Sequence, residues 1–334
     1  MKNMQFFFLF SNNLKGTIPS EIGKMTELKY LDLAHNSLTG TIPEMGMMTE
    51  LWVLTLCGNF LNGSIPSSLS KIGVSLTHLI LYSNFLSGSI PTSLGDLVNV
   101  KYFYVDNNRL NGSVPSSLCN MRSMKILYLR NNSLSGDIPT CIGNFINATH
   151  LYLDNNNFNG MIPISVGNLV NVIQLTLSDN SLIGTIPTSF GSLKQLQYLY
   201  IENNNLSGPF SFLLTIPSLI SLHASNNKNL IGNLNSLINS GTSQNLQYLL
   251  LAGINLAGSF NDDFFSLPSL ETVVLSNNCI TGSIPESICT AKNMKYFILD
   301  GAYSGSGCKR TKSTFNLRYQ FSGIIYLTIK IYLI

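Results

Sequence analysis

The chain has 334 residues, of which 45% are hydrophobic and 10% are charged, with 19 basic and 16 acidic side chains. A net charge of +3 does not predict a nucleic-acid surface, and six cysteines without a C-x-x-C pair do not fit common zinc-site spacings. The length alone suggests two globular domains, but a short internal period indicates a solenoid instead.

Asparagine recurs along almost the whole chain at steps of 23 to 25 residues. A period of that size is typical of stacked repeats, in which each unit buries its apolar face against its neighbours. Because an amide side chain both donates and accepts, asparagines stacked in register are expected to form a buried hydrogen-bonded column. This asparagine ladder comprises Asn12, Asn36, Asn59, Asn84, Asn108, Asn132, Asn156, Asn180, Asn204, Asn227 and Asn278.

The clearest copies of the repeat follow the pattern L-x-x-L-x-L-x-x-N-x-L-x-G-x-I-P, as in the stretch from Leu28 to Pro43. The L-x-L pair alternates with a period of two, which predicts a short strand with both leucines on one face. The glycine permits a backbone bend, and the Ile-Pro step favours extended chain. Apolar residues after the proline are expected to close the core from the opposite side.

This pattern resembles the leucine-rich repeat, in the 24-residue class that is typical of plant extracellular proteins. The resemblance covers residues 4–302 and implies an α/β fold, a right-handed horseshoe-shaped solenoid of about 12–13 repeats with a parallel β-sheet on its concave side. We therefore assign residues 1–302 to the solenoid and residues 303–334 to a tail outside the fold.

The first repeat begins at Met4, with no recognisable cap before it. The run from Phe6 to Phe10 could be taken for a secretory signal, but it is short, lacks a small-residue cleavage site and is in register with the repeats. We assign it to the first repeat. We accordingly expect the chain to be the remainder of a longer protein, or a gene product begun at an internal methionine.

Repeats five to nine carry tyrosines and charged residues at positions predicted to point out of the concave sheet. Tyrosine is enriched at recognition surfaces, and acidic neighbours favour a basic partner. The alternative is that tyrosine is simply a good strand residue on an exposed sheet face. The expected ligand-binding residues are Tyr102, Tyr104, Asp106, Tyr128, Arg130, His150, Tyr152, Asp154, Tyr198, Tyr200 and Glu202.

The cysteines suggest two bridges. The resemblance implies a Cys119–Cys141 disulfide between adjacent repeats, and with it an oxidising compartment. Cys289 and Cys308 bracket the last repeat and are a second candidate pair, with Cys279 as a competing partner for either. The alternative is that all the cysteines are reduced and merely small and apolar.

Two segments depart from the pattern. Residues 209–262 are irregular, with Ile254 at a ladder position, and either a local change in curvature or neutral drift accounts for them. The tail holds five basic residues and no acid, so residues 1–302 keep 14 basic and 16 acidic residues, a net charge of −2. Its last 14 residues are apolar but too short for a membrane span. The small residues at 304–306, a basic spacer and this apolar end together loosely imitate a lipid-anchor signal, and a truncated span or a spurious translated extension fits as well.

No catalytic constellation is recognisable, because the chain lacks P-loop, H-E-x-x-H, G-x-S-x-G and kinase motifs. Its four histidines fall in different repeats, too far apart to share a metal. Five N-x-S/T sequons permit glycosylation without arguing for it. We therefore expect no enzyme activity, no cofactor and no metal.

The sequence thus predicts a non-catalytic scaffold that recognises a protein or peptide on its concave face, as in the ectodomain of a receptor-like protein. A secreted inhibitor of a cell-wall hydrolase and an ectodomain fragment of a receptor kinase are the alternatives. The resemblance implies an extracellular or cell-surface location, roles in signalling or defence, and a co-receptor as a further partner. Nucleic acid is not an expected partner, and membrane association would need the tail or a missing segment.

Overall fold

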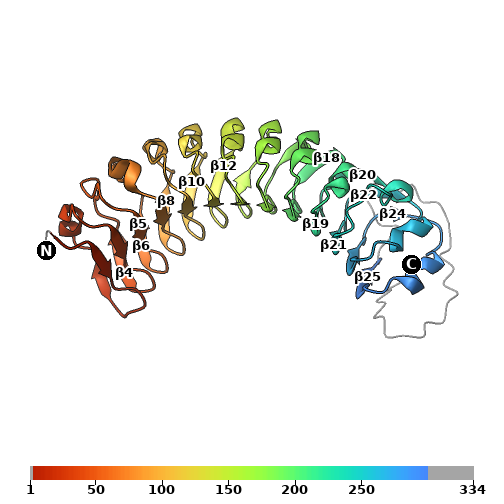
Figure 1. Cartoon of the computed structure of the whole chain (residues 1–334), viewed down its shortest axis with the longest axis horizontal. Helices are drawn as coiled ribbons and strands as arrows, with labels where there is room; N and C mark the ends of the chain where they lie inside the picture. The colour runs from red at the N-terminus through yellow and green to blue at the C-terminus, as the bar shows by residue number, and fades with distance from the viewer. Residues whose placement is uncertain (1–2, 300–334) are drawn as a thin grey trace. The chain divides into compact units, whose positions relative to one another are not determined.

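The computed structural model of the protein describes residues 3–299, so the predicted tail lies outside the described residues. Short β-strands alternate with 3-10 helices throughout this region (Figure 1). The chain divides into two compact units, residues 1–172 and 173–334. The helical part of the predicted α/β fold consists of 3-10 turns, since the described residues contain no α-helix.

The main sheet of the first unit is parallel, and its strands follow one another in chain order. Equivalent residues of neighbouring repeats pair directly, so that Tyr104 lies beside Tyr128 and Tyr128 beside Tyr152. The repeat pattern therefore sets the register of the sheet. The strands are β1 (Phe6–Phe8), β3 (Tyr30–Asp32), β5 (Val53–Thr55), β7 (His78–Ile80), β9 (Tyr102–Tyr104), β11 (Ile126–Tyr128) and β13 (His150–Tyr152).

A second parallel sheet and a row of 3-10 helices complete the first unit. Gly40 opens the return path with φ +76°, a left-handed conformation that a side chain would resist. The sheet comprises β2 (Lys15–Thr17), β4 (Ser37–Thr41), β6 (Phe60–Gly63), β8 (Phe85–Gly88), β10 (Arg109–Gly112), β12 (Ser133–Gly136) and β14 (Asn157–Phe158). The helices are η1 (Ser20–Lys24), η2 (Ser67–Ser75), η3 (Thr92–Asp96), η4 (Ser116–Asn120), η5 (Thr140–Asn144) and η6 (Ile164–Asn168).

The second unit repeats this plan. Its main sheet holds β15 (Gln174–Thr176), β17 (Tyr198–Tyr200), β19 (Ser221–His223), β21 (Tyr248–Leu250), β23 (Thr272–Val274) and β25 (Tyr296–Ile298). Its second sheet holds β16 (Ile183–Thr185), β18 (Asn205–Pro209), β20 (Asn229–Asn233), β22 (Asn255–Gly258) and β24 (Cys279–Ile280). Its helices are η7 (Thr188–Ser192), η8 (Ser211–Thr215), η9 (Leu234–Ser236), η10 (Asp262–Phe265) and η11 (Glu286–Thr290).

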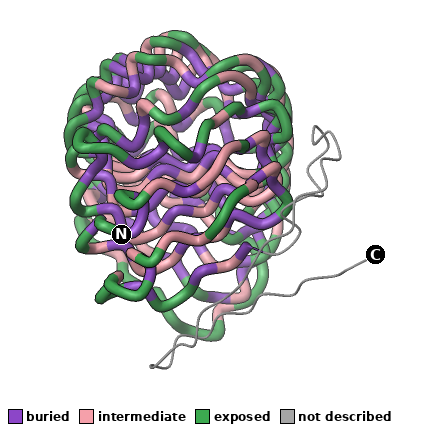
Figure 2. Tube along the Cα trace, turned by 90° about the vertical axis from the view of Figure 1, so that its right-hand side faces the viewer, coloured by how far each residue is buried: buried purple, intermediate pink, exposed green. Residues whose placement is uncertain are grey.

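The core of each unit lies between the main sheet and the helices. The middle residue of each main-sheet strand points inward, and Leu54, Phe103 and Leu127 are completely buried. Figure 2 shows buried, intermediate and exposed residues interspersed along the trace. Each fully buried leucine contributes about 1.5–3 kcal/mol to stability, so the stacked leucines are the main source of cohesion.

The ladder asparagines join one repeat to the next. Asn59 donates through Nδ2 to the carbonyls of Leu33 and Leu56 at 3.0 and 3.1 Å, while its Oδ1 accepts from the Leu38 amide at 3.0 Å. One side chain thus satisfies backbone groups of its own repeat and of the preceding one. Asn12 bonds only to carbonyls of its own repeat, those of Leu9 and Phe10.

The ladder is interrupted at Ile254, which is buried and cannot replace an amide. In regular repeats a leucine amide two residues after the ladder position donates to the next asparagine. The preceding repeat carries one extra residue here, and its Leu230 amide donates to the Asn227 carbonyl at 3.0 Å instead. The insertion and the missing asparagine therefore compensate each other. The predicted change in curvature stays a prediction.

Of the two disulfides predicted from the sequence, one is present. Cys119 of η4 and Cys141 of η5 form a disulfide with a Cα–Cα distance of 5.9 Å. The predicted pairing of Cys289 is wrong, because its thiol is free and exposed on η11. Cys279, the competing cysteine, is disulfide-bonded, while Cys308 lies outside the described residues. Among residues 3–299, no helix is long and apolar enough to cross a membrane.

Candidate functional site

A row of tyrosines lies on the exposed face of the first unit's main sheet. Tyr104, Tyr128 and Tyr152 end strands β9, β11 and β13, and we call them the tyrosine stripe. The rings of Tyr104 and Tyr128 stack with centroids 4.5 Å apart, and Tyr152 meets Tyr128 edge-on at 4.4 Å. Because each strand buries its middle residue, the two flanking side chains must point outward. The strand pattern therefore creates the stripe.

The phenols of the stripe are partly shielded from water. Burial and the neighbouring tyrosines raise the pKa of Tyr104 to about 12. Burial and the neighbouring Tyr128 likewise raise the pKa of Tyr152. Both hydroxyls are therefore protonated at neutral pH and can donate as well as accept hydrogen bonds. The stripe offers large apolar contact areas with polar tips.

Two further predicted residues flank the stripe on the same strands. The imidazole of His78 stacks on Tyr102 with ring centroids 4.5 Å apart, which fixes the Tyr102 ring. His150 faces its own Thr149 hydroxyl at 2.9 Å, and burial lowers the pKa of its imidazole. No cluster of metal-binding side chains occurs within the described part of the chain.

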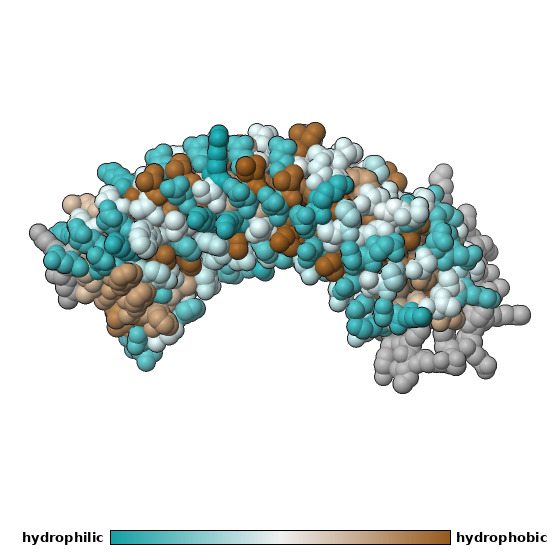
Figure 3. All heavy atoms as spheres, in the orientation of Figure 1, coloured by the Kyte–Doolittle hydropathy of each residue, from teal (hydrophilic) through white to brown (hydrophobic). Residues whose placement is uncertain are grey.

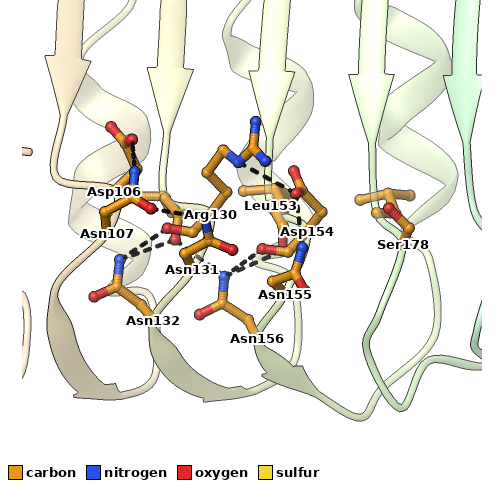
Figure 4. A network of polar contacts seen from close by, with 12 residues as sticks. Asp106, Asn107, Arg130, Asn131, Asn132, Leu153, Asp154, Asn155, Asn156 and Ser178 are labelled. Atoms are coloured by element: carbon orange, nitrogen blue, oxygen red, sulfur yellow. Dashed lines mark hydrogen bonds and ion pairs between the residues drawn. The ribbon is translucent and has the colours of Figure 1, made fainter. Parts of the chain in front are cut away.

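Charged side chains follow the tyrosine stripe, just after the end of each strand. Asp106, Arg130 and Asp154 occupy equivalent positions in three successive repeats, and we call them the charged row. Figure 4 shows their side chains at the ends of neighbouring strands. The Arg130 Nε atom lies 3.4 Å from an Asp154 carboxylate oxygen, and the Arg130 side chain is 41% exposed. The arginine therefore pairs with one acid and keeps part of its guanidinium in solvent.

Asp106 is the unusual member of the charged row. It is only 7% exposed, and its Oδ2 atom accepts a 2.6 Å hydrogen bond from the Asn107 amide. Its Oδ1 atom is buried and has no hydrogen-bond partner in the described structure. Burial raises the pKa of this carboxyl above its ordinary value, and Asp154 adds to the rise, while hydrogen bonds and Arg130 oppose it.

A second row of asparagines supports the charged row, and sequence analysis missed it. Asn107, Asn131 and Asn155 all adopt left-handed backbone conformations, with φ of 52°, 51° and 54°. The Asn131 amide donates to Asn107 Oδ1 at 2.7 Å, and the Asn155 amide donates to Asp154 at 3.1 Å (Figure 4). Asparagine tolerates this conformation better than most residues. The Asn-Asn doublets were the available signal.

The remaining predicted residues lie in the second unit. Tyr200 packs against His223 with ring centroids 4.4 Å apart, and the His223 Nδ1 atom is 4.0 Å from a Glu202 oxygen. Burial lowers the pKa of His223, so its imidazole is neutral at pH 7 and the contact is not a charged pair. Tyr198 begins the same strand as Tyr200. Tyr200 and His223 thus form a smaller aromatic pair, with Glu202 beside the imidazole.

The face drawn in Figure 3 shows hydrophobic side chains in small groups among hydrophilic ones, with one larger group over the N-terminal repeats. Scattered apolar residues of this kind are normal for a protein surface. The tyrosine stripe and charged row are accordingly the strongest candidate site, because they combine aromatic area, buried charge and fixed geometry. Eight of the eleven predicted residues lie in this unit.

Comparison with known families identifies the repeats. Models described as leucine-rich repeat match residues 146–206 and, separately, residues 27–46, 75–97, 99–121, 123–145 and 269–291. Together these matches cover more than half of the chain. The chain belongs to the leucine-rich-repeat family. Within this leucine-rich-repeat protein, the tyrosine stripe and charged row occupy positions that the repeat pattern does not specify.

Solved structures give the broadest likeness. The plant peptide hormone receptor RGFR1, in complex with RGF2, has a TM-score of 0.86 at 33% identity over 90% of this chain. The TDR receptor gives a TM-score of 0.76 at 29% identity over 90% of this chain. The Arabidopsis receptor kinase HAESA ectodomain, in complex with an IDA peptide hormone lengthened at its N-terminus, gives a TM-score of 0.69 at 28% identity over 89% of this chain.

A curated relative matches over a shorter stretch. The Arabidopsis thaliana leucine-rich repeat receptor-like serine/threonine-protein kinase RGI4 is 51% identical over 43 residues, which are 13% of this chain and 4% of that protein. This leucine-rich-repeat chain spans 48%, 56% and 57% of the three solved structures above. The likeness therefore concerns the repeat fold and about half of each ectodomain.

Proposed function

We propose that this leucine-rich-repeat chain is a non-catalytic scaffold that binds an extended peptide on the exposed face of β9, β11 and β13. The tyrosine stripe is the observation that carries the proposal. Rings that are already stacked have little freedom left to lose, so a ligand gains contact area at a low entropic cost. Main-chain groups of an extended peptide would find the phenol hydroxyls as hydrogen-bond partners.

The comparisons support a peptide as the partner. Two of the solved relatives are peptide-hormone receptors bound to their peptides. Such likeness favours a receptor ectodomain over a hydrolase inhibitor among the alternatives raised by the sequence. On the same grounds, we propose that the chain lies outside the cell or at the cell surface and that a co-receptor is its second partner.

A random peptide library tests the proposal. Displayed 12-residue peptides are selected on the intact chain, and selected sequences are synthesised for affinity measurements. The variant that combines Tyr128→Ala and Tyr152→Ala should bind them at least about tenfold more weakly, because two of the three stripe rings are lost. Its melting temperature should change little, since both side chains are partly exposed.

Tyr296→Ala provides the matched control. This tyrosine is 54% exposed on β25, outside the stripe, so its removal should leave peptide affinity unchanged. The proposal fails if no peptide can be selected, or if the double variant binds the selected peptides as well as the unmodified chain does.

A further inference from the structure

We infer that Asp106 is a subsite for a basic side chain of the bound peptide, a guanidinium or an ammonium group. The inference rests on the proposed function and names the chemistry of its ligand at one position. It starts from a carboxylate that the fold buries without completing its hydrogen bonds.

The Asp106 carboxylate is half satisfied. Asn107 supplies one 2.6 Å hydrogen bond to Oδ2, and Oδ1 has no partner among the described residues. Buried polar atoms are almost always hydrogen-bonded, and an ionised oxygen without a partner is costly. A ligand that donates a hydrogen bond to this oxygen would remove that cost.

The charge balance also favours a cation. Arg130 lies between the two acids in the charged row, and within residues 3–299 its ion pair is with Asp154. Asp106 and Asp154 are both more than 90% buried, so two shielded carboxylates share one guanidinium. A ligand cation at Asp106 would neutralise the remaining charge, whereas a ligand anion would be repelled.

The tyrosine stripe supplies the walls of this subsite. Tyr104 precedes Asp106 by two residues, and the Asp106 charge contributes to the raised pKa of Tyr104. The Tyr104 ring stacks on that of Tyr128 with centroids 4.5 Å apart. A cation within about 6 Å of an aromatic face is attracted by the ring electrons. The stem of an arginine or lysine can therefore lie along Tyr104 while its charged end reaches Asp106.

The peptides selected from the 12-residue library provide the test. Arginine or lysine should recur at one position, and replacing it by citrulline, which keeps the shape of arginine without its charge, should weaken binding at least about tenfold. Asp106→Asn should weaken binding of the arginine peptide by a similar factor. The same substitution should leave binding of the citrulline peptide nearly unchanged, because the charge pair is already absent.

A matched control and separate outcomes keep the two proposals apart. Asp96→Asn removes the same charge from the exposed end of η3 and should not alter either affinity. If peptides bind through Tyr128 and Tyr152 but show no basic preference, or if Asp106→Asn retains that preference, the subsite is refuted and the scaffold stands. If no peptide binds at all, the proposed function and the subsite fall together.

Discussion

At the scale of single residues, asparagine side-chain amides connect neighbouring repeats by hydrogen bonds. A ladder asparagine such as Asn59 is 5% exposed and bridges two repeats with four hydrogen bonds. No apolar residue of similar size can do this, since the partners are backbone donors and acceptors together. The neighbouring left-handed asparagines add a second column at Asn107 and Asn131.

Asn59→Ala should lower the free energy of unfolding by about 1–3 kcal/mol, because the Leu38 amide and the Leu33 carbonyl lose a partner inside the fold. Urea titration followed by circular dichroism measures the loss. Asn12→Ala is the control, since Asn12 is exposed and bonds only within its own repeat. An equal effect at both positions would refute the bridging role.

Replacing Asp106 is expected to stabilise the protein, in contrast to replacing Asn59. Burial raises its folded-state pKa, so the folded chain holds this proton more tightly than the unfolded chain does. Ionisation of Asp106 therefore destabilises the folded state. This destabilisation is absent below the unfolded-state pKa, grows between the unfolded-state and folded-state pKa values, and is complete above the raised folded-state pKa. Asp106→Asn should accordingly stabilise the protein at neutral pH by roughly 1 kcal/mol.

The pH profile of that variant distinguishes the cause. The groups that influence the Asp106 charge are Arg130 and Asp154, and Tyr82 and Tyr104 lie within its electrostatic range. Thermal melts of both proteins between about pH 3 and 8 should converge at the acidic end, where the unmodified side chain is also neutral. A constant difference at every pH would mean that the effect is steric.

At the scale of elements, most repeats consist of a strand, a return strand and a 3-10 turn, and a departure from the pattern changes the structure locally. The extra residue after Asn227 brings the Leu230 amide to the Asn227 carbonyl, and the next ladder position then accommodates an isoleucine. A stack in which each repeat contacts only its neighbours can absorb such a change without disturbing distant repeats.

Ile254→Asn should therefore not restore the ladder. The new amide would find the Leu230 amide already bonded, and the buried isoleucine contacts would be lost, so the variant should be less stable by about 1–3 kcal/mol. The repeat consensus alone predicts a gain in stability. Deleting Lys228 in the same variant removes the extra residue and should recover part of the loss. Denaturant titration of the three proteins decides between the two expectations.

At the scale of the whole molecule, two compact units each repeat one plan, and function depends on what varies between repeats. The first unit gathers three tyrosines and a charged row on one sheet face, while the second carries a smaller aromatic group around Tyr200. Likeness to plant receptors extends over about 90% of the chain, so the plan is shared with them.

The sequence by itself determined the repeat length, the strand register and which residues face outward. It could do so because a period of 24 residues with two inward leucines leaves one consistent stacking. The same register places Tyr104, Tyr128 and Tyr152 in one column.

Only the tertiary structure decided how individual side chains meet. Whether Arg130 pairs with Asp106 or Asp154 depends on rotamers and distances of a few ångströms, which no spacing rule records. Which cysteine of the last repeat is bonded was likewise not fixed by spacing, since Cys279 is disulfide-bonded and Cys289 is free. The unmet oxygen of Asp106 likewise exists only once neighbouring repeats close over it.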